Sequence, residues 1–276
     1  MYLVRYGEKG KERPGILKGS RVVDLASHLP GVPDIGPEFF AGGWLEKARE
    51  VDAKGEILSQ RLGPPVTRPE KIICLGKNYA DHAKEGNMDV PERPLLFCKT
   101  PNTLNGPEDD ILLPKSSGRV DWEVELCVVM GRGGKGISRE EALSRVAGFC
   151  VMNDVSGREA QFGDGQWFRG KSFDTFAPLG PVLATPDEVD LASLTLKTRV
   201  NGRLMQHGTT ADMLFDVPSI IEFISRDITL APGDLVSTGT PAGVGIFRDP
   251  PVTLSPGDLV ECFISGLGTL RNRVRG

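Results

Sequence analysis

Four carboxylates have a spacing that could bring them to one cation. Asp121, Glu123 and Glu125 alternate with apolar residues in the segment DWEVELCVVMG. On a strand all three would therefore share one face. Asp154 follows a second apolar run, FCVMN. Like charges in a row are unfavourable unless something neutralises them, and carboxylates at the ends of buried strands are typical ligands of hard cations. A solvated face of an edge strand is the simpler explanation for an isolated D-x-E-x-E motif.

Two other patterns could supply acid–base chemistry. His82 and Glu85 are three residues apart in NYADHAKEG, so they would share one face of a short helix. There the carboxylate would orient the imidazole and raise its basicity. Lys171 lies among glycine, serine and aromatic residues in WFRGKSFDTF, unlike a solvated lysine. Taken alone, the spacing of His82 and Glu85 is better explained by an ordinary surface pair. A salt bridge or a snorkelling stem explains Lys171 as well as a functional role does.

A loop rich in glycine and hydroxyl groups, STGTPAGVG at 237–245, follows a predicted strand. Free N–H groups and hydroxyls in such loops bind carboxylates or phosphates. Its glycines match neither a P-loop nor a dinucleotide-binding fingerprint. A plain turn is the alternative.

Short strands dominate the elements that must position these residues. Alternating or continuous apolar runs predict strands, Asn201-Gly202 predicts a hairpin turn, and Ser138 predicts a helix N-cap. No βαβ rhythm is present, which favours a mainly-β, α+β fold over a Rossmann fold or a TIM barrel. The predicted strands are 72–76, 94–99, 121–131, 149–156, 196–202, 234–240 and 258–266. The predicted helical segments are 44–62, which Gly55 could interrupt, 78–86, 138–148 and part of 213–225.

A proline-rich stretch, GPPVTRP at 63–69, reads as a linker. It predicts a small β-rich N-terminal domain over 1–66 and a catalytic domain over 67–276.

The overall composition excludes several classes of protein. The chain has 276 residues, 39% of them hydrophobic, and a net charge of -4, which is typical of a globular protein and not of a nucleic-acid-binding surface. No run is long enough for a membrane span and no signal peptide is visible, so we expect a cytoplasmic protein.

The five scattered cysteines, all in apolar stretches, predict buried free thiols. With only three histidines, any metal is expected to have oxygen ligands.

In their order and spacing these motifs resemble the fumarylacetoacetate hydrolase family from Ile72 to Val274. The resemblance rests on GKNYADHAKE, PLLFCKTPNTLNGP, DWEVELCVVMG, GFCVMNDVSGREAQ, KSFDTFAPLGP and LAPGDLVSTGTPAGVG. The N-terminus is similar to a subgroup of diketo-deoxy-sugar-acid and acylpyruvate hydrolases. The resemblance implies a mixed β-sandwich roll with a small β-rich N-terminal domain, a homodimer, and a mobile lid at 86–91.

The resemblance also implies roles for individual residues. The metal, Mg²⁺ or else Mn²⁺ or Ca²⁺, would be held by Glu123, Glu125 and Asp154. Catalysis would use His82, Glu85 and Lys171. The residues expected to contact a small oxo-acid substrate are Arg158, Gln161, Thr240 and Tyr79.

The implied activity is Mg²⁺-dependent hydrolysis of a C–C bond in a 2,4-dioxo acid, with His82 activating water and a pyruvate-type product leaving. Two alternatives use the same metal-stabilised enolate. They are decarboxylation of oxaloacetate, which needs no water, and isomerisation of 2-hydroxyhepta-2,4-diene-1,7-dioate. A non-catalytic metal- or ligand-binding module is a further alternative, from another class.

Overall fold

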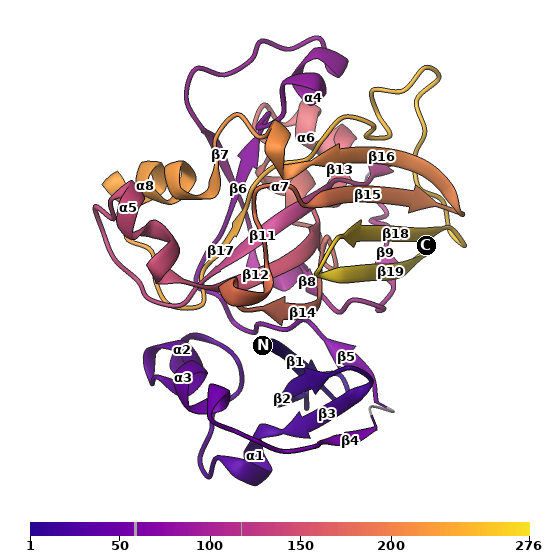
Figure 1. Cartoon of the computed structure of the whole chain (residues 1–276). Coiled ribbons are helices and arrows are strands. Elements are labelled where there is room, and N and C mark those ends of the chain that lie inside the picture. Colours follow the sequence, from indigo (N-terminus) through magenta and orange to yellow (C-terminus); the bar gives the residue numbers. More distant parts are fainter. Residues whose placement is uncertain (58–59, 117) are drawn as a thin grey trace.

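The computed structural model describes residues 1–57, 60–116 and 118–276, and it has the predicted strand-rich α+β fold (Figure 1). Its described strands form a mixed sheet of twelve, a smaller sheet of five and a two-stranded pair. The path through the large sheet is β4 (Glu56–Ile57), β3 (Arg21–Asp24), β2 (Arg13–Lys18), β1 (Tyr2–Tyr6), β14 (Ala177–Ala184), β12 (Val146–Asn153), β11 (Val124–Met130), β17 (Leu235–Ser237), β6 (Ile72–Gly76) and β7 (Leu95–Lys99). Off this path, β5 (Leu62–Gly63) pairs with β1 and β8 (Leu104–Asn105) pairs with β14.

The smaller sheet lies beside β11, β12 and β14 of the large one (Figure 1). Its strands follow the order β16 (Arg203–Thr209), β15 (Thr195–Val200), β18 (Leu259–Ile264), β19 (Gly268–Arg275) and β9 (Ile111–Leu112). The two-stranded pair joins β10 (Val120–Asp121) to β13 (Ser156–Gly157). The α-helices are α1 (Leu25–His28), α2 (Pro37–Ala41), α3 (Trp44–Arg49), α4 (Ala80–Glu85), α5 (Arg139–Ala142), α6 (Arg158–Gly163), α7 (Phe168–Lys171) and α8 (Val217–Asp227).

None of the described helices combines the length and the apolar character needed to cross a membrane.

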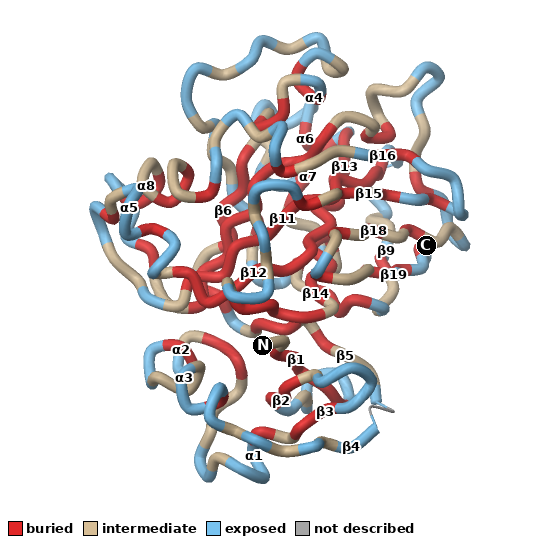
Figure 2. The backbone as a smooth tube through the Cα atoms, in the orientation of Figure 1, coloured by how far each residue is buried: buried red, intermediate tan, exposed pale blue. Residues whose placement is uncertain are grey.

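Strands β11 and β12 are buried along their whole length (Figure 2). Leu126 and Val128 of β11 belong to one hydrophobic cluster, together with Trp122. Cys127 and Val129, on the opposite face of the same strand, belong to another. A strand with a core on each side needs a continuous apolar run, and this is why LCVVM does not alternate. Such strands offer a rigid base for polar groups at their ends.

The N-terminal strands continue the large sheet, because β1 pairs antiparallel with β14. In Figure 1 these strands and α1–α3 lie below the rest of the molecule, in indigo. The predicted boundary at residue 66 lies between β5 and β6, where the chain passes into the larger part. The division into two domains at this point stays a prediction.

Several predicted elements are present with nearly the predicted bounds. Strand β6 spans the predicted segment. The hairpin turn between β15 and β16 has φ of +50° at Asn201 and +80° at Gly202, as a type I′ turn requires. The Ser138 hydroxyl caps α5 by accepting from the Glu141 N–H.

Other expectations were wrong. The helical segment 44–62 ends at Arg49, and β4 then pairs with β3. Gly55, at φ +66°, turns the chain where a Cβ would lie 2.7 Å from the Val22 carbonyl oxygen. Residues 58–59 of that segment lie outside the described part of the chain. The helix predicted over 138–148 stops at Ala142.

The long strand predicted over 121–131 is interrupted at residues 122–123, between β10 and β11. The Trp122 side chain is fully buried, and its indole N–H donates to the Gly243 carbonyl oxygen at 3.2 Å. Of the five cysteines, Cys98 is exposed, because it lies on β7, the edge strand of the large sheet.

The close packing of β12 against β14 gives a stability test. A Cβ on Gly148 would lie 2.3 Å from the Ala184 carbonyl oxygen, so Gly148→Ala should cost about 1–3 kcal/mol of unfolding free energy. Urea unfolding measures this. The control is Gly163→Ala at the end of α6, where a Cβ meets no atom within 4 Å. We expect that variant to match the parent, and equal losses in both would contradict the packing argument.

Candidate active site

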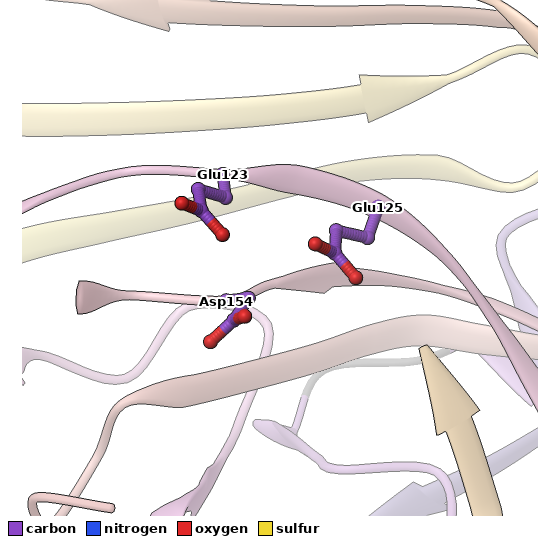
Figure 3. A group of neighbouring side chains, drawn as sticks. All are labelled: Glu123, Glu125 and Asp154. Atoms are coloured by element: carbon purple, nitrogen blue, oxygen red, sulfur yellow. The ribbon is translucent and has the colours of Figure 1, made fainter. Parts of the chain in front are cut away.

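Three acidic side chains meet at one end of β11 and β12 (Figure 3). Glu123 precedes β11, Glu125 lies in it, and Asp154 follows β12. The pairing of Val124 with Asn153 aligns the two strand ends, and the Asp154 N–H donates to the Glu123 carbonyl oxygen at 2.8 Å. One carboxylate oxygen from each residue lies within 4.8 Å of the others, and all three residues are buried. The structure thus brings together three of the four acids that the sequence spacing singled out.

Three cationic side chains surround these acids. Lys171 Nζ donates to Glu123 Oε2 and to Asp154 Oδ2, both at 2.7 Å. Lys99 Nζ donates to Asp154 Oδ1 at 2.6 Å. Arg158 Nη2 donates to Glu123 Oε1 at 2.7 Å. Because these ion pairs are buried, each charge depends on its partners for stabilisation.

Asp121 belongs to the same network through Arg158. The Arg158 Nε donates to Asp121 Oδ1 at 2.7 Å, and the Ile246 N–H donates to Asp121 Oδ2 at 2.8 Å. Asp121 therefore fixes the guanidinium and is not one of the three clustered acids. We call Asp121, Glu123, Glu125, Asp154, Lys99, Arg158 and Lys171 the charge cluster. It contains four carboxylates and three cations, a formal charge of −1.

The charges of the cluster act differently on the pKa values of its two glutamates. Burial by itself would raise the pKa of Glu123, but the charges of Lys171 and Arg158 lower it well below its ordinary value. Burial, with the negative charges of Asp154 and Glu123, raises the pKa of Glu125 well above its ordinary value. Glu125 has no cationic side chain as a hydrogen-bond partner in the described part of the chain; its Oε2 accepts from the Ser237 hydroxyl and the Gly239 N–H. Among the described residues, the ionised form of Glu125 thus lacks the cationic partners that stabilise Glu123 and Asp154.

This donor set fits a divalent cation. The three acids offer only oxygen atoms, which Mg²⁺, Mn²⁺ and Ca²⁺ prefer. A divalent cation beside Glu125 would relieve the repulsion that raises its pKa. It would also change the formal charge of the cluster from −1 to +1, which suits an anionic ligand.

His82 and Glu85 are neighbours on α4, but they are not hydrogen-bonded to each other. His82 Nδ1 lies 3.7 Å from Glu85 Oε2, which is too long for a hydrogen bond. Glu85 instead accepts from the Gly243 N–H, at 2.9 Å and 3.1 Å to its two oxygens. The His82 ring is buried and tilted against Phe247, with its Nδ1 unpartnered among the described residues. In this structure Glu85 ties α4 to the loop at 237–245.

A small cavity of about 30 Å³ adjoins the charge cluster. It has room for one or two water molecules, so a larger ligand requires part of its wall to move. Arg158 and Gln161 line it and are joined by a hydrogen bond of 2.9 Å. Thr240 also lines it, with its hydroxyl donating to the Val124 carbonyl oxygen. The other polar side chains of the wall are Lys77, His82, Glu123, Glu125 and Lys171.

Tyr79 lies elsewhere. Its side chain is buried, and burial together with the charge of Glu125 raises the pKa of its hydroxyl. Tyr79 is not among the described residues that line the cavity. Its contact with substrate stays a prediction.

Two further residues of the site, Lys99 and Gln206, were not predicted from the sequence. Lys99 ends the apolar strand PLLFCK, and a lysine at the end of such a strand could have been recognised as a candidate site residue. Gln206 is buried on β16, accepts from the Val124 N–H, and donates to the Thr240 hydroxyl and the Pro241 carbonyl oxygen. Its place on a strand of the other sheet gives no sequence signal.

Residues 71–275 match the model of the fumarylacetoacetate hydrolase C-terminal domain. The chain belongs to the fumarylacetoacetate hydrolase family. A human mitochondrial oxaloacetate tautomerase is 49% identical over 265 residues, which cover 93% of this chain and 84% of the relative. The relatives include enzymes of more than one reaction type.

Two solved structures of this family share the whole fold. The fumarylacetoacetate hydrolase of Exiguobacterium antarcticum superposes with a TM-score of 0.89 at 38% identity, covering 100% of this chain and 99% of that one. A 5-carboxymethyl-2-hydroxymuconate delta-isomerase of Mycobacterium smegmatis superposes with a TM-score of 0.81 at 32% identity, covering 100% and 98%.

The cluster geometry predicts which acids control metal binding. Glu125→Gln should weaken Mn²⁺ binding by more than about 100-fold, because the amide has no negative charge. The amide oxygen can still accept from Ser237 and Gly239, so the local hydrogen bonds are kept. Asp121→Asn should weaken binding by about tenfold at most, the lower end of the effect of a residue that only supports ligands. Calorimetric titration with Mn²⁺ compares the two variants. Equal losses would show that the three-acid group is not the ligand set.

Proposed function

We propose that this protein moves a proton on a small 2-oxo diacid, interconverting the keto and enol forms of an oxaloacetate-type substrate, with a divalent cation such as Mg²⁺ at Glu123, Glu125 and Asp154. The observation that carries the proposal is a single cavity lined by His82 and by four residues of the buried charge cluster, Glu123, Glu125, Arg158 and Lys171. The names of the human relative and of the Mycobacterium smegmatis isomerase support it. Tautomerases and isomerases both shift protons on enolisable oxo acids.

The residues of the cluster suit an enolate. When bound, the cation supplies a Lewis acid that polarises the 2-oxo group. Lys171 places a positive charge beside Glu123 and Asp154, where negative charge develops on the substrate oxygen. The Arg158 guanidinium, held by Asp121, has further N–H groups for the substrate carboxylate.

His82 is the proposed base. It takes a proton from C3 of the keto acid, and the electron pair of that C–H bond forms the C2–C3 double bond while the carbonyl π pair moves to the 2-oxo oxygen. The imidazolium, or water, then gives a proton to that oxygen and the enol results. The reverse sequence returns the keto form, so no oxidant or co-substrate is needed. Unlike Glu85, whose carboxylate accepts from Gly243, His82 Nδ1 has no partner in the described part of the chain.

Hydrolysis of a C–C bond in a 2,4-dioxo acid is the second candidate. The closeness of Glu85 to His82, 3.7 Å, favours it, because a small shift would let the carboxylate orient the ring for water activation. Decarboxylation of oxaloacetate would use the same enolate without that water. We also propose a homodimer, a cytoplasmic location and a mobile lid at 86–91. The lid is supported by the small cavity and by the arch of chain between α4 and β7 at the top of Figure 1.

Replacing His82 tests the proton step. His82→Gln should reduce the rate of oxaloacetate keto–enol conversion, followed by the ultraviolet absorbance of the enol, by about 10²–10⁴-fold. Mn²⁺ affinity should stay within about threefold, because His82 is not one of the clustered acids. Acylpyruvate cleavage, assayed in parallel, separates the two candidates. Unchanged keto–enol conversion with lost cleavage would favour hydrolysis as the function.

Replacing Glu85 distinguishes two roles for its carboxylate: accepting the Gly243 N–H to hold α4 in place, or orienting the His82 ring. Glu85→Gln can still accept from Gly243, so kcat/KM should stay within about threefold of the parent if holding α4 is its role. Glu85→Ala loses that acceptor and should reduce kcat/KM by about tenfold, the order of one hydrogen bond to a charged group. Similar large losses in both variants would show that the negative charge itself is required, as in the His–Glu dyad.

A further inference from the structure

Lys77 is a cation of the cavity wall that the proposed chemistry does not use. It lines the same cavity as His82, Arg158 and Lys171 and is half-buried. Arg158 and Lys171 are held in buried ion pairs. Lys84, on the following helix, pairs with Asp81, whereas Lys77 has no ion-pair partner in the described part of the chain. Its positive charge is therefore free for a ligand.

The backbone holds Lys77 in an unfavourable conformation at this place. Its φ is +59°, a left-handed value that glycine adopts freely and a lysine adopts only at a cost. The next residue, Asn78, maintains it: its Nδ2 donates to the carbonyl oxygens of Thr238 and Phe215, and its Oδ1 accepts from the Phe215 N–H. Such strain persists where the surroundings enforce it, and it often marks a functional position.

Charge balance indicates what Lys77 would bind. With a divalent cation the charge cluster carries +1, enough for the carboxylate next to the 2-oxo group. The second carboxylate of a diacid would still need a partner. Much of the remaining wall is apolar, with Leu75, Phe97 and Trp167 among its residues, and a carboxylate against such a wall loses hydration without compensation.

We propose that Lys77 binds the distal carboxylate of the substrate and so makes the site selective for 2-oxo diacids over 2-oxo acids with an uncharged tail. This inference rests on the proposed function, since it assumes that the 2-oxo carboxylate end faces the charge cluster. Lys77 is then a specificity-determining residue that acts on binding and takes no part in the proton transfer.

The test compares oxaloacetate with its 4-methyl ester, which has the same enolisable centre but no distal charge. In Lys77→Gln we expect KM for oxaloacetate to rise by roughly 10- to 100-fold, the range of one hydrogen bond between charged groups. The kcat for oxaloacetate, and both constants for the ester, should stay within about threefold. Lys77→Arg, which keeps the charge, should restore most of the affinity. Lys84→Gln is the matched control and should resemble the parent.

The second measurement is the calorimetric binding of two ligands to the Mn²⁺-loaded protein. One is 3,3-difluorooxaloacetate, which cannot enolise, and the other is oxalate, which has no tail. Lys77→Gln should weaken the first and leave the second unchanged. Equal losses for both ligands, or no loss for the diacid, would overturn the role of Lys77 even if oxaloacetate is converted. Lys77-dependent diacid binding without conversion would instead remove the proposed reaction and keep the diacid site. A parent protein that neither converts nor binds the diacid would overturn both.

Discussion

Burying four carboxylates beside the ends of two apolar strands is the constraint on which the rest of the site depends. Isolated charges in such a place are unstable, so each must have partners close by. Lys171, Lys99 and Arg158 supply them for Glu123, Asp154 and Asp121. Among the described residues, Glu125 receives hydrogen bonds only from a hydroxyl and a backbone N–H, and this imbalance is the strongest reason to expect a cation at that point.

The architecture follows from this constraint. Strands β11 and β12 have a core on each face and hold the acids rigidly. In the loop after β17, backbone N–H groups donate to carboxylates of the protein itself, Gly239 to Glu125 and Gly243 to Glu85. That loop therefore connects the charge cluster to α4, the helix that bears His82, and a displacement of α4 would change the cavity and the base together.

Membership of the fumarylacetoacetate hydrolase family is consistent with one site serving several reactions. Hydrolysis, decarboxylation and tautomerisation of oxo acids share an enolate. They differ in which bond of the substrate is broken and in whether a water molecule attacks it. In this chain the differences would lie in residues outside the charge cluster: the position of the His82 ring relative to Glu85, and the charge of Lys77 on the cavity wall. His82 lies on α4, and Lys77 lies three residues before the helix begins.

The sequence by itself determined the strand-rich fold class, the family, the hairpin at Asn201-Gly202 and the identity of the three clustered acids, because these depend on local periodicity and on motifs continuous in the chain. It did not determine where the helical segments 44–62 and 138–148 end, since the residues that follow the helices pair with strands elsewhere in the chain, β4 with β3 and β12 with β11. The roles of Lys99, Gln206 and Glu85 also required the tertiary structure. Their partners are Asp154, Thr240 and Gly243, residues far away in the chain, and buried charges and polar groups take whichever partners the fold brings within hydrogen-bond distance.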